Sequence, residues 1–397
     1  MSLRTVVLLL SLSGTLFAES ALLSTEKEKI LEHKKNEVDS GAKALRYNWI
    51  APLNLTVSHT EQKGVGESSF SGFNQASASF DQDLFRSGGI YYAMRYADDK
   101  HGYDLLSWHE ERDTLSLALF SAVLNIRKAR LQCERSDYLL KNLEIALTIK
   151  RQQYEAGATD ITELNDAIMA RNSEQKNFFA LRQSLLDYRA ELKKYSDREA
   201  ESITLPEFVV YDRETYLSQN YAAALAKRQS DVAYDTYKVT KAGYLPALSL
   251  NTQARYVDYH NAALSADDGS SYSVGLSLSM PLEYNSFDSV EEARAAMLRQ
   301  KAEAADRVRE EGQKYEQTRN LISRYEEENR VLGENLKLYD TLLEVAQKGY
   351  ASGLKTGYDV QTLSHTRKIG ELDIAINRLN IQLEMAKLHY GTYGRGE

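Results

Sequence analysis

The stretch Tyr-Glu-Ala-Gly-Ala-Thr-Asp-Ile-Thr-Glu-Leu (residues 154–164) returns, in altered form, as Tyr-Ala-Ser-Gly-Leu-Lys-Thr-Gly-Tyr-Asp-Val (residues 350–360). The two copies align without a gap at a spacing of 196 residues, which pairs Glu163 with Asp359. Self-similarity at a fixed spacing indicates that the chain is built from two copies of one structural plan.

Each copy has the chemistry of one helix that ends and another that begins. Gly157 and Gly353 suit the position just after a helix, where a positive φ costs glycine nothing. In both copies an N-capping residue and an acidic residue three positions later follow, namely Asp160 with Glu163 and Thr356 with Asp359. An acid at that position can accept a hydrogen bond from the backbone of the cap. The two stretches therefore predict tight turns between antiparallel helices.

The amino-terminal residues and the cysteine count describe an exported protein without an internal disulfide. Residues 1–18 combine Arg4, an apolar run and Ala18 at a plausible cleavage site, as in a signal peptide. The mature chain, residues 19–397, is expected to be a single protomer. Its one cysteine, Cys133, has no intrachain partner and lies where a small buried side chain packs well. The net charge of -8 argues against a nucleic-acid binder.

No arrangement of residues indicates catalysis. The seven histidines are scattered, without a pair at the spacing of metal ligands. The sequence contains neither a nucleophile elbow nor a phosphate-binding glycine loop. We therefore expect no enzymatic activity, no cofactor and no metal site. After the signal peptide, no apolar run approaches the roughly 18 residues of a membrane-spanning helix.

Two pairs of strands interrupt a chain that is otherwise helical. Alternation of apolar and polar side chains predicts strands at 49–58, 73–85, 248–256 and 273–282. The fourth strand has the most regular pattern, because every second residue from Val274 is apolar and the residues between them are serine, glycine or proline. Such a strand has one apolar face and one polar face.

The remaining segments predict long helices. They comprise a polar helix at 24–46, arms at 89–156 and 286–350, a shorter helix at 213–241, and a helix after each turn. Apolar residues in the arms recur at alternating spacings of four and three, as from Leu115 to Leu147, which predicts coiled-coil packing. At 1.5 Å per residue each arm would be roughly 100 Å long. The plan of a strand hairpin and a long helical hairpin occurs at about 47–196 and again at about 244–393.

Four alternating strands in an exported chain pose a physical problem. If their apolar face meets lipid, every strand edge must be paired, because an unpaired backbone group in hydrocarbon costs several kcal/mol. Four strands are too few to close a conducting barrel, so several chains would have to share one. The narrow apolar seams of the helices likewise favour lateral association into a larger cylinder.

Across nearly all of the mature sequence, the chain resembles the TolC-type outer-membrane efflux proteins. The resemblance rests on the two Tyr-x-x-Gly turns, each with a carboxylate six residues beyond its glycine, and on the strand pairs that begin near Pro52 and Pro246. It implies a mainly helical protein with a membrane β-barrel portion. Three identical chains would each give four strands to a shared twelve-stranded barrel, and their long antiparallel coiled-coil hairpins would form a periplasmic tunnel.

The function that the resemblance implies is that of a passive exit duct in the outer membrane. An inner-membrane pump would drive transport through a periplasmic adaptor. Drugs, metal ions, peptides and proteins all leave through such ducts, so the cargo stays open. The alternative is a non-membrane periplasmic adaptor or coiled-coil scaffold, which would share the helices but would not need strands with a lipid-compatible face.

The resemblance also implies a gate at the two turns. In the family, a tyrosine and a basic residue of the second turn bind the first-turn carboxylate, and these positions correspond here to Tyr350, Lys355 and Glu163. An acidic ring can narrow the entrance. Asp359 matches one of its members, but Thr362 occupies the place of the second, whereas Glu163 and Asp166 have the required spacing on the first turn. Helix capping alone is the competing explanation of Glu163 and Asp359.

Overall fold

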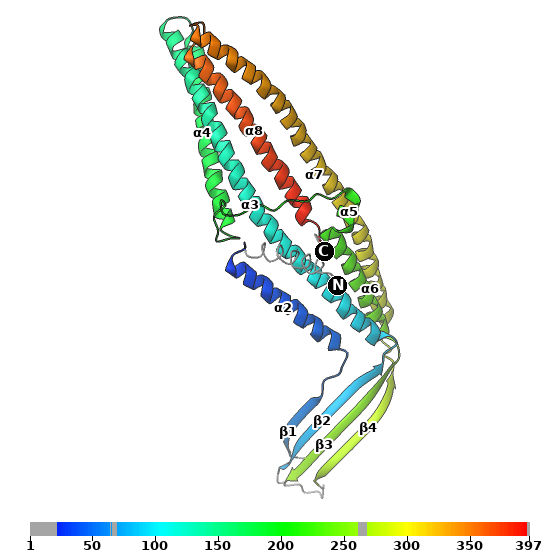
Figure 1. The fold of residues 1–397 in the computed structure, drawn as a ribbon. Coiled ribbons are helices and arrows are strands. Elements are labelled where there is room, and N and C mark those ends of the chain that lie inside the picture. The colour runs from blue at the N-terminus through cyan, green and yellow to red at the C-terminus, as the bar shows by residue number, and fades with distance from the viewer. Residues whose placement is uncertain (1–21, 64, 66–69, 261–267, 395–397) are drawn as a thin grey trace, which may run out of the picture. The chain divides into compact units, whose positions relative to one another are not determined.

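A computed structural model describes residues 22–63, 65, 70–260 and 268–394, so the signal peptide expected at 1–18 lies outside the described residues. The elements in chain order are α2 (Thr25–Tyr47), β1 (Asn54–Gln62), β2 (Ser71–Phe85), α3 (Gly89–Glu155), α4 (Ile161–Leu192), α5 (Arg213–Ser218), α6 (Tyr221–Gly243), β3 (Ala247–His260), β4 (Gly269–Ser279), α7 (Ser286–Ala351) and α8 (Gly357–Tyr390). The predicted order of strand hairpins and long helical hairpins is confirmed (Figure 1).

The helix expected at 213–241 is wrong as a single element, because it is divided into α5 and α6 at Asn220. The carboxy-terminal segment causes this break. The backbone N–H of Tyr221 donates to the Gly391 carbonyl at 3.0 Å, and that of Tyr393 donates to the Gln219 carbonyl at 2.9 Å. A short antiparallel bridge to the chain end therefore replaces one turn of helix.

The ends of two strands also differ from the prediction. The first strand begins at Asn54, and the preceding segment is held by a side chain instead of a strand. Gln82 of β2 accepts from the Ala51 N–H at 2.9 Å and donates to the Trp49 carbonyl at 3.1 Å. The fourth strand ends at Ser279, shortly before Pro281, whose missing N–H cannot join a strand ladder.

The four strands form one antiparallel sheet in the order β1-β2-β3-β4. The two predicted hairpins are joined because β2 pairs with β3. Across the sheet, Val57 of β1 lies opposite Ala76 of β2, which lies opposite Tyr256 of β3. The sheet belongs to a compact unit made of residues 33–107 and 223–307.

A second compact unit, which comprises residues up to 32, 108–222 and from 308 onward, contains the helical core. Its most buried side chains include Leu119, Phe120, Val123 and Ile126 of α3, with Tyr390 of α8 stacked on Phe120 at a centroid distance of 5.9 Å. The heptad seam predicted for α7 also packs, because its members Ile322 and Ala346 are buried. The predicted coiled-coil faces are therefore the faces that pack.

Polar contacts fix the helices of this unit against one another along their length. Arg135 of α3 donates to Asp373 of α8 at 2.6 Å, and Arg367 of α8 donates to Asp340 of α7 at 2.5 Å. Cys133 is half-buried in the seam, and burial raises the pKa of its thiol, which agrees with an inert packing role. In the described part of the chain, no helix is both long enough and apolar enough to span a membrane.

Candidate functional site

The first turn joins α3 to α4 through a glycine in the left-handed region. Gly157 has a φ of +69°, as its predicted place after the helix requires. Asp160 caps α4 by accepting from the backbone N–H groups of Thr162 at 2.9 Å and Glu163 at 3.0 Å. The side chain of Glu163 forms an ion pair with Lys150 on α3, and no bond from the cap backbone to this carboxylate is present among the described residues.

The second turn joins α7 to α8 and completes the capping box that the sequence predicts. Gly353 has a φ of +73°. The Asp359 N–H donates to the Thr356 hydroxyl at 3.3 Å, while the Thr356 N–H donates to the Asp359 carboxylate at 2.8 Å. The two aligned acids therefore have different partners: Asp359 stabilises the start of its own helix, and Glu163 bridges two helices.

Both carboxylates are held in the ionised form. The hydrogen bond from Lys150 lowers the pKa of Glu163. Hydrogen bonds from the Thr356 backbone and side chain lower the pKa of Asp359, and the nearby Lys355 charge adds to this effect. The two turns thus present negative charge at neutral pH.

The other predicted gate residues lie on the same two turns. Tyr350 is 58% exposed, with its ring near Gly357. The Lys355 side chain lies over Gly349, and in the described chain neither it nor Tyr350 forms a hydrogen bond or ion pair with Glu163. Asp166 is exposed one helical turn beyond Glu163. The proposed contacts between unlike turns therefore stay a prediction.

A groove of about 680 Å³ lies between the end of α3 and the start of α8. Ile149, Gln152 and Ala156 line one side, and Tyr358 and Asp359 line the other. This places the first and second turns next to each other in one chain. Sequence reasoning missed Lys150, because its partnership with Glu163 depends on the pairing of α3 with α4 and has no local motif.

The sheet has one apolar face and one polar face. On the apolar face, Leu55 lies opposite Ala78, which lies opposite Ala254 and then Tyr272. Exposed apolar side chains cover this face from β1 to β4, namely Leu55, Val57, Tyr256, Tyr272, Val274, Leu276 and Leu278. Nothing in the described chain packs over most of them, so this surface needs an apolar environment outside the chain.

The polar face carries hydroxyl, amide and a few charged side chains. Ser249 donates to Asp83 at 2.6 Å, and Asn251 donates to Asp81 at 3.1 Å. Ser277 of β4 extends this ladder by donating to Asn251 at 2.7 Å. Such cross-strand hydrogen bonds suit a surface that faces water.

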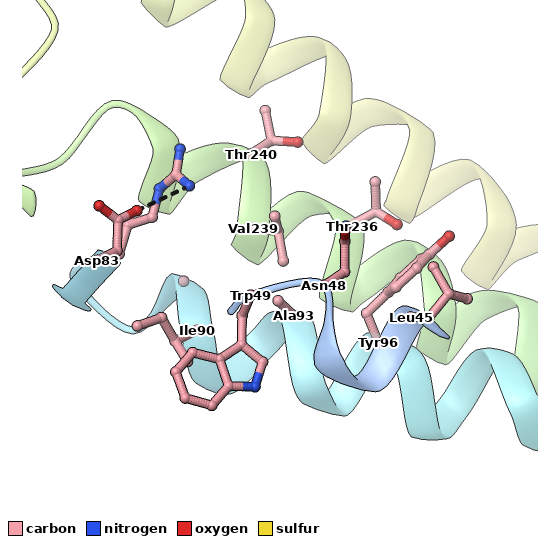
Figure 2. Close-up of a pocket in the computed structure, with 12 residues that line it drawn as sticks. Leu45, Asn48, Trp49, Asp83, Ile90, Ala93, Tyr96, Thr236, Val239 and Thr240 are labelled. Atoms are coloured by element: carbon pink, nitrogen blue, oxygen red, sulfur yellow. Dashed lines mark ion pairs between the residues drawn. The ribbon is translucent and has the colours of Figure 1, made fainter. Parts of the chain in front are cut away.

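A cavity of about 380 Å³ lies where the strands meet the helices of the sheet unit. Figure 2 shows side chains of α3 and α6 and of the segment after α2 gathered around it, among them Trp49, Ile90 and Val239. The Arg86 guanidinium lies 3.4 Å from the Asp83 carboxylate at this site. The cavity is mainly apolar and contains no set of metal-binding side chains among the described residues.

One protein-family model matches part of the chain. The model of the family described as outer membrane efflux protein matches residues 214–366. No curated protein sequence matches the chain.

Solved structures match the fold over almost the whole chain. The outer membrane protein VceC from Vibrio cholerae is 15% identical, with a TM-score of 0.71 over 93% of each chain. The CmeC outer membrane channel of Campylobacter jejuni is 13% identical, with a TM-score of 0.71 over 94% of this chain and 84% of that one. The open state of the MtrE channel of Neisseria gonorrhoeae is 13% identical, with a TM-score of 0.70 over 96% of this chain and 88% of that one.

Together these findings confirm the predicted resemblance and the fold class. The family match covers the second strand pair and the second turn, and the structural matches extend the fold to both copies of the plan. The matched model describes an outer membrane efflux protein and not an enzyme, which agrees with the expectation for this chain.

Proposed function

We propose that the chain is one protomer of a homotrimeric exit duct, from the premise that residues 214–366 match the family described as outer membrane efflux protein. Its sheet would sit in the outer membrane and its helices in the periplasm. The duct would be passive: an inner-membrane pump would supply the energy, and a periplasmic adaptor would connect the two. The chain itself would need no catalytic residues, because a duct only encloses the path along which substrates move.

The main support for this proposal is the division of the sheet into one apolar face and one polar face. Apolar rows run from Leu248 to Tyr256 on β3, a span of roughly 27 Å at 3.4 Å per residue, or about 20 Å after the tilt usual in barrels. This is close to the apolar band of outer-membrane barrels. The next row toward the hairpin connections is polar, with His59, Asn74 and Asp258 linked by hydrogen bonds. A band of this height with a polar border suits a bilayer.

The edges of the sheet require further copies of the chain. Among the described residues, β1 and β4 each pair on one side only. In hydrocarbon these open edges would be costly, and a four-stranded sheet cannot close on itself around a channel. Joining β4 of one copy to β1 of the next closes the ring, and three copies give the twelve strands that the resemblance implies.

At the helical turns, we propose that Glu163, Asp166 and Asp359 line the periplasmic entrance. Tyr350 and Lys355 would bind the first-turn acid of a turn related by symmetry and hold the entrance narrow. The exposure of Tyr350 and the location of Lys355 on the same turn support this, because both remain accessible to a neighbouring copy. Capping by Asp359 does not exclude pore lining, since the residue is only partly buried.

Planar-bilayer recording on the detergent-purified protein tests this function. We expect a stable trimer with a small cation-selective conductance that increases in Tyr350→Phe and in Glu163→Gln. A protein that is monodisperse without detergent and gives no current in any variant would instead support a periplasmic scaffold and would overturn the proposal.

A further inference from the structure

The polar face of the sheet has an uneven distribution of charge along the strands. Within β1 to β4 its only charged side chains among the described residues are Asp81, Asp83 and Arg255. Asp81 and Asp83 lie toward the end of β2 that leads into α3, and Arg255 lies nearer the hairpin connections. Serine, threonine, asparagine and glutamine make up most of the rest of this face.

Both acids already have partners within the chain, as hydrogen bonds or an ion pair. Asp83 accepts from Ser249 at 2.6 Å and pairs with Arg86 at 3.4 Å. Asp81 accepts from Asn251 at 3.1 Å. These partners satisfy the carboxylates and reduce the field that they exert on the space in front of the sheet.

Arg255 differs because, among the described residues, no carboxylate is paired with it. Its neighbours across the strands are Ser77 of β2 and Ser271 of β4. Its Nε is buried and has no hydrogen-bond partner among the described residues. The nearest acid along this face, Asp81, lies four residues from Ser77, which is roughly 13 Å along the strand. In the described part of the chain, the guanidinium therefore presents a positive charge that no acidic side chain compensates.

Apolar side chains follow Arg255 toward the hairpin connections. Val257 is 8% exposed, and Phe73 lies opposite Tyr259 with ring centroids 5.7 Å apart. Their low polarity reduces the local dielectric response and so strengthens the field of a neighbouring charge. Arg255 is thus placed between a hydroxyl-lined stretch and an aromatic one.

We propose that Arg255 is a specificity-determining residue of the duct. In the trimer that the proposed function assumes, three copies of its guanidinium form a ring inside the barrel, because the polar face is the face that encloses the lumen. A ring of like charges sets the sign of the ions that pass. This ring favours anionic groups of the cargo, in contrast to the acidic turns, which favour cations.

Reversal potentials across a planar bilayer under a potassium chloride gradient test this assignment. Arg255→Gln is expected to raise the ratio of potassium to chloride permeability by about threefold relative to the unmodified trimer. Arg255→Lys keeps the charge and should leave the ratio unchanged. A channel that conducts normally while Arg255→Gln leaves the ratio unchanged would overturn the role of Arg255 and leave the proposed function intact.

A second variant keeps the test valid if Arg255→Gln does not assemble. Ser271→Asp places a carboxylate directly across the strand pair from Arg255, where it can neutralise the guanidinium without removing it. It should raise the same permeability ratio. An unchanged ratio in Ser271→Asp would also overturn the assignment, whereas the absence of current in the unmodified trimer would refute the proposed function itself.

Discussion

Glu163 of α4 forms an ion pair with Lys150 of α3, whereas its aligned counterpart Asp359 accepts hydrogen bonds from Thr356 on its own helix. The duplicated turn therefore has two different electrostatic roles. In the first turn the acid connects two helices that run past each other. In the second turn it stabilises the start of one helix and leaves Tyr350 and Lys355 accessible.

Removal of Lys150 tests whether its pair with Glu163 competes with the proposed gate. In Lys150→Met, Glu163 loses its ion-pair partner and becomes more available to bind Tyr350 or Lys355 of another turn. We expect single-channel conductance at or below that of the unmodified trimer, while Glu163→Gln increases it. If Lys150→Met increased conductance as much as Glu163→Gln, the ion pair itself would be what keeps the entrance narrow.

The capping box of α8 makes a prediction about local stability. Thr356→Ala removes the hydroxyl that accepts from the Asp359 N–H, and a lost N-cap costs about 1 kcal/mol. Amides of the first turn of α8 should then exchange with solvent about fivefold faster, as measured by hydrogen-exchange mass spectrometry. Thr356→Ser keeps the acceptor and serves as the control. Equal exchange in both variants would show that the cap contributes little.

We expect a turn glycine and a helix glycine to differ in how substitution by alanine changes the stability of the protein. Gly353→Ala places a Cβ at a φ of +73°, which costs about 1 kcal/mol or more. Gly41→Ala lies in α2, where a Cβ meets nothing within 4 Å, so it should be neutral or stabilising. Thermal unfolding of the purified protein should place the transition of Gly353→Ala below that of Gly41→Ala. The reverse order would contradict the left-handed turn.

Asp235 predicts a pH dependence in the sheet unit. Its side chain is fully buried between α6 and α3. This burial raises its pKa to about 7, and the carboxylates of Asp99 and Asp231 act in the same direction. The Arg95 guanidinium, 3.2 Å away, opposes the shift without cancelling it. A raised carboxyl pKa means that the folded state binds more protons than the unfolded state between about pH 4 and 7. Stability should therefore fall as pH rises through this range and level off above it.

The variant Asp235→Asn removes the titrating group and keeps its size. Thermal midpoints measured from pH 5 to pH 8 should decline with pH in the unmodified protein and change less in Asp235→Asn. Parallel curves for the two proteins would show that Asp235 does not titrate in this interval.

Neighbouring residues of β4 provide a test of which face meets lipid. Val274 is 77% exposed on the apolar face, and Ser273 lies on the polar face. Val274→Lys should cost about 2–4 kcal/mol in the middle of a bilayer, whereas Ser273→Lys faces water and should be tolerated. The yield of folded trimer in the membrane fraction measures this difference. A smaller yield for Ser273→Lys than for Val274→Lys would reverse the assignment of faces.

Much of the fold was predictable because its signals are local. The heptad seam of α7 and the alternation in β4 follow from the order of side chains alone, and both turns follow from Gly157, Gly353 and their caps. The division between α5 and α6 was not predictable, because it depends on backbone pairing with residues 391–393, about 170 positions away. A helix-compatible sequence can be interrupted by such a partner without any local sign.

The candidate site shows the same limit. Asp359 was predicted correctly as a capping residue, since its partner Thr356 lies three positions before it. The pairing of Glu163 with Lys150 requires knowledge of how α3 and α4 align. The neutral surroundings of Arg255 likewise become visible only when the strand register places Ser77 and Ser271 beside it.

In the described part of the chain β1 and β4 each have one unpaired side, which has a consequence for how the protein is made. If the chain is exported as we propose, a new copy would cross an aqueous compartment with two open strand edges and an exposed apolar sheet face. In the proposed trimer, insertion and assembly would be coupled steps, and the rate of maturation should rise steeply with protein concentration. Copies whose β4 and β1 edges paired in the wrong register would not close the proposed ring and would be prone to aggregate.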